Sequence, residues 1–115
     1  MKVDQYDIVY FVGIGGIGMS ALARWFAQKG ASVSGYDRTP TALTDSLTGE
    51  GILIHYNDEI NEIPAEVILN KEKVLVIYTP AIPKEHKEFE YLFSNGYLIK
   101  KRSQVLGMLT ENRFT

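Results

Sequence analysis

The sequence predicts an α/β fold, with an open, mainly parallel sheet of five strands and helices on both faces. Short apolar segments alternate with segments of helical spacing, the pattern of strand–helix–strand crossovers. The apolar run 74–78 is uninterrupted, as in strands that are covered on both faces. A glycine cluster at 13–18 follows the first apolar run and opens a helical segment. In such sheets, ligands lie beyond the carboxyl ends of the strands.

Each element is expected from its local pattern. Strands are expected near residues 7–12, 32–36, 52–56, 74–78 and 97–100. Helices are expected near residues 18–29, 40–51, 85–94 and 103–110. Gly30 follows the first, Gly49 and Gly51 mark the end of the second, and Asn95-Gly96 follow the third. The acidic segment 57–64 is expected to be a loop, and 65–70 fits either a short helix or a strand. One face of the first helix is expected to carry Ile17, Ala21, Leu22, Trp25 and Phe26.

Gly13, Gly15 and Gly18 fit the pattern G-x-G-x-x-G between a strand and a helix, which predicts a Rossmann-like nucleotide site. Glycine allows unusual backbone angles and lets loop N–H groups approach a phosphate. The positive end of the helix dipole adds to this attraction, so the expected ligand is a nucleotide diphosphate. Asp37 ends the second strand about 20 residues later, where it would face a ribose or base. The alternatives are a purely structural turn and a solvated turn aspartate.

Composition limits the other possibilities. The 115 residues suffice for one domain, and a net charge of −2 gives no basic surface for nucleic acid. Cysteine is absent, no apolar run reaches membrane-spanning length, and the first residues lack an apolar signal core, so we expect a cytoplasmic protein without a membrane partner.

The chain carries binding motifs but no recognisable catalytic ones. His55 and His86 are isolated and there is no cysteine, so no metal site is expected. Neither G-x-S-x-G nor a triphosphate P-loop occurs, and no catalytic residue is assigned. His55 would lie at a strand end, as a ligand contact or simply as a polar end residue. Glu85, Glu88 and Glu90 are interpreted as a solvated helix face.

Four segments together resemble the N-terminal domain of the Mur ligase family, in the family's order: residues 11–23, 33–37, 78–82 and 101–106. Gly16 and the pair Met19-Ser20 resemble the loop of those members that join L-alanine to UDP-N-acetylmuramate. The chain departs from the family at Tyr36, where serine is usual, and at Gln104, where glutamate is common. It also has His86-Lys87-Glu88 where Asn-Pro-Glu is common.

The resemblance implies a domain that binds UDP-N-acetylmuramate for ATP-dependent ligation in peptidoglycan synthesis. It implies that residues 1–115 are one domain of a larger ligase, cut near a domain boundary and inactive alone. ATP and Mg²⁺ would belong to a central domain and the amino acid partly to a C-terminal domain, with no cofactor in this chain. The muramyl carboxylate would be activated as an acyl phosphate and attacked by the amine of alanine.

The same resemblance assigns the candidate site. The diphosphate would be cradled by Gly13, Ile14, Gly15, Gly16, Ile17, Gly18 and Ser20. The uridine would lie near Asp37, Arg38 and Thr39, with His55 on the same rim. The path to the sugar would be lined by Thr79, Pro80 and Ala81. Three other interpretations remain at this point. They are a related ligase that recycles muramyl peptides, whose glycine loop is less similar, an NAD(P)-binding domain of an oxidoreductase or regulator, and an interaction module without a ligand.

Overall fold

The computed structural model describes residues 6–83 and 85–112, the last five by their backbone alone. Five strands form one sheet in the order β3-β2-β1-β4-β5, and every neighbouring pair is parallel. The strands are β1 (Ile8–Val12), β2 (Ser32–Tyr36), β3 (Leu53–His55), β4 (Val74–Tyr78) and β5 (Leu98–Lys101). The predicted open parallel sheet is confirmed. Its strand order reverses direction at β1, between β2 and β4, where open α/β sheets bind ligands.

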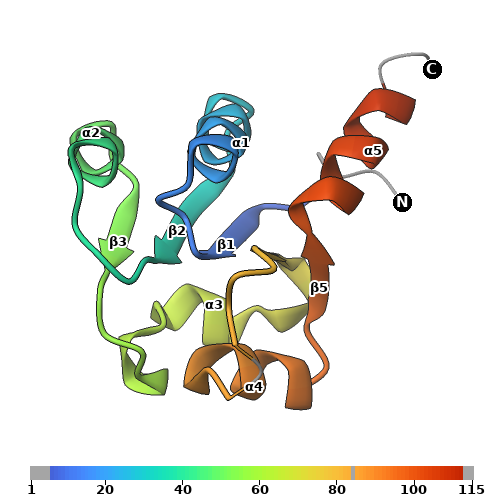
Figure 1. The fold of residues 1–115 in the computed structure, drawn as a ribbon. Coiled ribbons are helices and arrows are strands. Elements are labelled where there is room, and N and C mark those ends of the chain that lie inside the picture. Colours follow the sequence, from blue (N-terminus) through green and yellow to red (C-terminus); the bar gives the residue numbers. More distant parts are fainter. Residues whose placement is uncertain (1–5, 84, 113–115) are drawn as a thin grey trace.

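Helices cover both faces of this sheet, as Figure 1 shows. They are α1 (Ile17–Gln28), α2 (Ala42–Gly49), α3 (Ala65–Leu69), α4 (Lys87–Ser94) and α5 (Arg102–Asn112), with single 3₁₀ turns at Ile60–Glu62 and Lys71–Lys73. One face packs against α1, α2 and α5, and the other against α3 and α4. The segment 65–70, which fitted either element, is therefore helical. Within the described residues, none of the helices is long and apolar enough to cross a membrane.

The central strand β1 supplies both halves of the core. Val9 and Phe11 belong to the cluster under α1, whereas Tyr10 and Val12 belong to the cluster above α3 and α4. This follows from the alternation of side chains along a strand, and both sets are fully buried. The sheet is thus fixed from both sides, which holds the loops at the carboxyl ends of its strands in a constant arrangement.

The apolar face expected on α1 is only partly the face that packs against the sheet. Ile17 is 86% exposed and Ala21 is also exposed, while Met19, Leu22 and Phe26 are buried. Both series have helical spacing and both are apolar, so periodicity alone could not choose between them. The first buried residue of α1 is Met19, two residues after the exposed Ile17.

Candidate functional site

The loop after β1 is held between the ends of two neighbouring strands. The N–H groups of Gly13 and Ile14 both donate to the carbonyl oxygen of Tyr36, at 2.8 and 3.0 Å. Gly13 has φ +96°, and a Cβ there would lie 2.5 Å from Cγ2 of Thr79. Both the backbone angle and the close approach require glycine at this position. The loop therefore begins as a fixed turn at the point where the strand order reverses.

The start of α1 is left open to an anion. Gly16 is the N-cap residue and makes no side-chain capping hydrogen bond, and the first turn holds no acidic residue. The unpaired N–H groups and the helix dipole give this end a positive potential. Arg102, at the start of α5, adds a cation, since a Cβ at Gly18 would lie 2.8 Å from its Nη1. This arrangement favours a phosphate group.

Asp37 follows β2 and contacts the glycine loop. Its Oδ1 accepts a hydrogen bond from the N–H of Gly15 at 2.8 Å, and its Oδ2 accepts one from Thr39 at 3.1 Å. A Cβ at Gly15 would lie 2.7 Å from that Oδ1. The carboxylate at the end of β2 thus fixes the position of the glycine loop, and the second glycine of the motif makes this contact possible.

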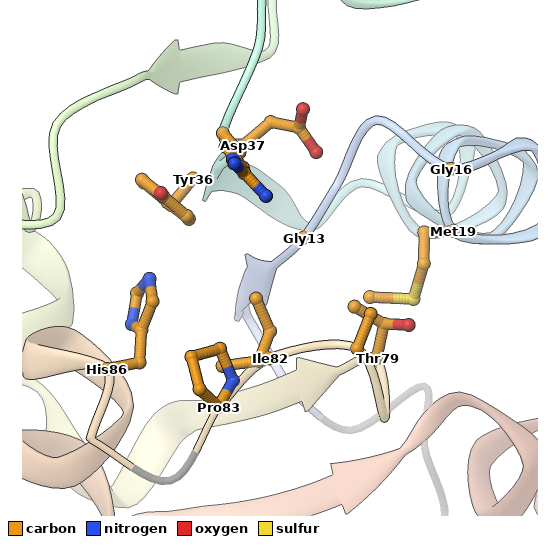
Figure 2. A pocket seen from close by; sticks show the side chains of 11 residues that line it. Gly13, Gly16, Met19, Tyr36, Asp37, Thr79, Ile82, Pro83 and His86 are labelled. Carbon is orange, nitrogen blue, oxygen red and sulfur yellow. The ribbon is translucent and has the colours of Figure 1, made fainter.

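A cavity of about 520 Å³ runs from the glycine loop past the end of β2 (Figure 2). The side chains in Figure 2 come from three parts of the chain, namely the glycine loop with α1, the end of β2, and the segment that follows β4. The lining residues are Gly13, Gly16, Met19, Tyr36, Asp37, Arg38, Thr79, Ala81, Ile82, Pro83 and His86. A mixed wall of glycine backbone, charged groups and apolar side chains suits a ligand with an anionic part and a ring.

Six of the predicted site residues line this cavity, and they are Gly13, Gly16, Asp37, Arg38, Thr79 and Ala81. Three other predicted residues do not line the cavity but contact side chains beside it. Gly15 and Thr39 hold Asp37, and Gly18 lies against Arg102. The Ile17 side chain points into solvent. Pro80 is exposed and is not one of the lining residues within the described part of the chain.

Two predicted residues support the loop from below. Ile14 is fully buried, and a Cβ at Gly35 would lie 3.0 Å from its Cδ1, so it packs tightly against β2. Ser20 is buried as well, and its hydroxyl donates to the carbonyl oxygen of Ile17 at 2.9 Å. In this structure both residues shape the loop rather than present a group to the cavity.

His55 is half-buried and contacts a buried polar pair, Tyr10 and Glu88, apart from the cavity lining. Its Nε2 is 2.8 Å from Oε2 of Glu88 and 3.2 Å from the hydroxyl of Tyr10. Tyr10 also donates to Glu88 in a short hydrogen bond, and the Glu59 N–H donates to the same carboxylate. Burial, followed by the charge of Glu88, raises the pKa of Tyr10 well above its ordinary value.

The interpretation of Glu88 as a solvated residue is wrong, because its side chain is fully buried. Glu85 and Glu90 are exposed, as expected. Charge patterning could not separate them, since a carboxylate is buried only where the fold brings partners to it. Those partners come from β1, β3 and the turn before α3, which are distant in sequence.

Several lining residues were not predicted, chiefly Met19, Tyr36, Ile82, Pro83 and His86. Tyr36 and His86 meet edge to face with ring centroids 4.7 Å apart, and burial raises the pKa of Tyr36. His86 is the N-cap residue of α4, a position that the sequence marks only by the acidic residues after it. In the sequence these residues share only their position near the predicted ends of strands. That feature does not distinguish them from neighbouring residues that do not line the cavity.

These features define a Rossmann-like α/β domain whose glycine-rich loop opens on a cavity at the strand ends. A family model described as "Mur ligase family, catalytic domain" matches residues 8–114, and the chain belongs to the Mur ligase family. The resemblance noted from the sequence is thereby confirmed.

Individual relatives agree with this assignment. A UDP-N-acetylmuramate–L-alanine ligase of Cytophaga hutchinsonii is 53% identical over 111 residues, and one of Phocaeicola vulgatus is 54% identical over 110 residues. Each alignment covers 96% of this chain and 24% of the relative. The crystal structure of a UDP-N-acetylmuramate–alanine ligase from Thermotoga maritima superposes with a TM-score of 0.79 at 28% identity, covering 90% of this chain and 23% of that one. The chain thus spans about a quarter of the length of these relatives.

Proposed function

We propose that this chain is the part of a UDP-N-acetylmuramate–L-alanine ligase that holds the UDP moiety of its substrate. The observation that carries the proposal is the cavity that joins the glycine loop to the end of β2. Its dimensions and polarity fit a diphosphate at the start of α1 and a nucleoside beside Tyr36, Asp37 and Arg38. The relatives bearing that activity match nearly the whole chain, which supports the same assignment.

In this proposal each part of the site has a distinct task. The N–H groups of the glycine loop and the start of α1 bind the diphosphate, with Arg102 adding positive charge. Thr79 and Ala81 line the side on which the sugar leaves the cavity. Asp37 would exchange part of its contact with Gly15 for the ribose hydroxyls. All of these are binding roles, and no bond-making step is assigned to this chain.

The chemistry of ligation is proposed to depend on the rest of a longer protein. The γ-phosphoryl group of ATP would be transferred to the muramyl carboxylate, releasing ADP. The amine of alanine would then attack the acyl phosphate, forming the amide and releasing inorganic phosphate, and Mg²⁺ would supply positive charge for the phosphates. This sequence contains no triphosphate P-loop, and the described residues include no group of three potential metal ligands, so they do not fit ATP or Mg²⁺. We propose a cytoplasmic location for this step of peptidoglycan synthesis, where ATP and UDP-activated sugars are available.

A binding measurement tests the proposal against the dinucleotide alternative. Both ligand classes offer a diphosphate to the loop, so discrimination must come from the groups at its two ends. Calorimetry on the 115-residue chain with UDP-N-acetylmuramate, UDP, NAD and NADP is expected to rank the UDP-sugar first and UDP second. Because part of the sugar would contact absent segments, we expect dissociation constants of about micromolar to millimolar. Tighter binding of NAD than of UDP-N-acetylmuramate would overturn the proposal.

A further inference from the structure

Tyr36 forms the wall of the cavity on the side away from the start of α1. Figure 2 shows Tyr36 and His86 together on that side, opposite Gly16 and Met19. Tyr36 is the last residue of β2 and lines the cavity, yet it is only 7% exposed. Most of its side chain packs into the core cluster above α3 and α4. The residue is therefore a buried wall of the cavity rather than a side chain that moves freely in solvent.

Two imidazole rings pack against the ring of Tyr36. The ring of His86 meets it edge to face with centroids 4.7 Å apart, and the ring of His55 lies 5.8 Å away at a tilt of 54°. Aromatic pairs are favourable in such arrangements when their centroids lie within about 7 Å. Rotation of the Tyr36 side chain would break these contacts, so the two histidines restrict its ring to the observed position.

His86 is itself fixed at the start of α4. Its Nδ1 accepts a hydrogen bond from the Phe89 N–H at 3.4 Å, so a neutral imidazole carries its proton on Nε2. Within the described residues Nε2 has no hydrogen-bond partner, and the edge-to-face packing offers its N–H the face of the Tyr36 ring, a weak acceptor. Asp58 secures the same helix start, because its carboxylate accepts two N–H groups of the first turn of α4 at 2.9 and 3.0 Å.

His55 is held by the buried polar pair Tyr10 and Glu88. Its Nε2 lies 2.8 Å from Oε2 of Glu88, and the other carboxylate oxygen accepts the hydroxyl hydrogen of Tyr10. Glu88 is fully buried and belongs to α4, the helix whose N-cap residue is His86. Both supports of the Tyr36 ring therefore depend on α4, and the packing of this helix sets the position of the cavity wall.

We propose that Tyr36 is a specificity-determining residue whose fixed ring limits the depth of the nucleoside end of the cavity, so that a single-ring pyrimidine enters and a fused two-ring purine is excluded. This inference rests on the proposed function, because it concerns the base of the nucleoside assigned to this cavity. A wall that cannot turn aside selects by size, since extra ligand atoms must displace packed side chains. His55 and Glu88 are positioning residues, because neither is among the lining residues in the described part of the chain and both act through Tyr36.

Ligands that share one diphosphate isolate this effect. UDP, ADP and methyl diphosphate all present a diphosphate ester to the glycine loop, so that part of the affinity is common to the three. UDP should gain affinity over methyl diphosphate because its base is buried. ADP should gain little, because its base does not fit beside Tyr36 and stays in solvent. The affinity of ADP relative to methyl diphosphate thus reports whether the wall excludes a purine.

Calorimetry with these three ligands compares the wild-type chain with Tyr36→Leu. The wild-type chain is expected to bind UDP about tenfold more tightly than ADP, and ADP within about twofold of methyl diphosphate. In Tyr36→Leu the shorter side chain leaves room for the second ring, so ADP should bind about fivefold more tightly than methyl diphosphate. Tyr97→Leu is the matched control and should keep the wild-type ratios. Tyr97 is 8% exposed in the same core cluster, but it is not among the lining residues in the described part of the chain.

Two further variants separate the shape of the ring from its hydroxyl and from its supports. Tyr36→Phe keeps the ring and should still exclude ADP, whereas entry of ADP would contradict selection by shape. His55→Ala removes one support of the ring and should raise the affinity of ADP relative to methyl diphosphate by about threefold. It should leave the affinity for methyl diphosphate itself unchanged. Equal losses for all three ligands would contradict the positioning role of His55.

Measurements on the wild-type chain keep the inference testable if a variant fails the circular dichroism check of its fold. With UDP bound, nuclear Overhauser effects are expected between the ring protons of uracil and those of Tyr36. Their absence, wild-type binding of ADP well above that of methyl diphosphate, or an unchanged ADP ratio in folded Tyr36→Leu would each overturn the inference and leave the proposed function standing. Failure of the wild-type chain to bind UDP at all would overturn both.

Discussion

The Asp37 carboxylate accepts a hydrogen bond from the Gly15 N–H at 2.8 Å, placing a negative charge on the loop proposed to bind a diphosphate. An incoming phosphate would meet like charge there, while a ribose would meet a good acceptor. Asp37 therefore weakens binding of the diphosphate and strengthens binding of the ribose. These two effects can be separated by ligands that carry one part or both.

We expect Asp37→Asn to tighten binding of pyrophosphate, because the substitution removes the like charge but keeps an acceptor for Gly15. Binding of UDP should gain less, since the amide accepts ribose hydrogen bonds more weakly than a carboxylate. The ratio of UDP affinity to pyrophosphate affinity should thus fall by about threefold, within the range of partly exposed charge interactions. Calorimetry with the two ligands measures it. An unchanged ratio would show that Asp37 does not contact the nucleoside.

Gly15→Val should abolish UDP binding in a domain that stays folded. Its Cβ would lie 2.7 Å from Oδ1 of Asp37, so the flexible carboxylate must move and release the loop, while the β-branched side chain fills space needed by the diphosphate. Gly49→Ala is a suitable control because its Cβ would meet no atom within 4 Å. Circular dichroism checks the fold and calorimetry the binding. A variant that unfolds would instead assign Gly15 a purely structural role.

Glu88→Ala should destabilise the fold by about 3 kcal/mol, because it leaves the Tyr10 hydroxyl and His55 without their common buried acceptor. Glu90→Ala removes the same charge from an exposed position of the same helix and should change stability by less than about 0.5 kcal/mol. Urea denaturation of both variants gives the two values. Equal effects would contradict a stabilising role for the buried cluster.

The contrast between these two glutamates shows what the sequence could predict. The five strands, the glycine loop and the presence of Asp37 at a strand end follow from local patterns, because periodicity and glycine placement act over a few residues. The burial of Glu88 depends on Tyr10 and His55, which lie 78 and 33 residues away in sequence. A local sequence pattern cannot predict these contacts, because they form only when distant segments pack together.

The candidate site divides in the same way. Gly13 and Asp37 were predicted from motif spacing and line the cavity. His86 was not predicted, although it lies 4.7 Å from Tyr36 between ring centroids, because the chain between them passes through two strands and two helices. His55 was predicted at the rim of the site, at the carboxyl end of its strand. In the structure its imidazole contacts the buried carboxylate of Glu88 instead of lining the cavity.

Stability should depend on pH through His86. Burial holds its pKa below the ordinary value of 6.5, against the opposing charges of Asp58 and Glu88. Below about pH 6.5 the unfolded chain therefore takes up a proton that the folded chain does not, and the folded state loses stability as the pH falls. Above that pH both states are neutral and the contribution is absent. The difference in unfolding free energy between the wild-type chain and His86→Asn should narrow from pH 7.5 to pH 5, and parallel profiles would contradict this.

Arg102→Gln should weaken binding of pyrophosphate and UDP by similar factors, because the guanidinium lies over Gly18 at the start of α1, where both ligands would place phosphate. An exposed charge pair of this kind is worth up to about 1 kcal/mol, so the loss should be about fivefold at low salt and smaller at high salt. Lys73→Gln removes the same charge just before the amino end of β4, away from the carboxyl ends of the strands where the cavity lies, and should have no comparable effect. Titrations of both variants at two ionic strengths separate a local contact from a general change in net charge. Equal losses for the two variants would mean that only net charge matters, and a loss confined to UDP would place Arg102 against the nucleoside instead of the phosphates.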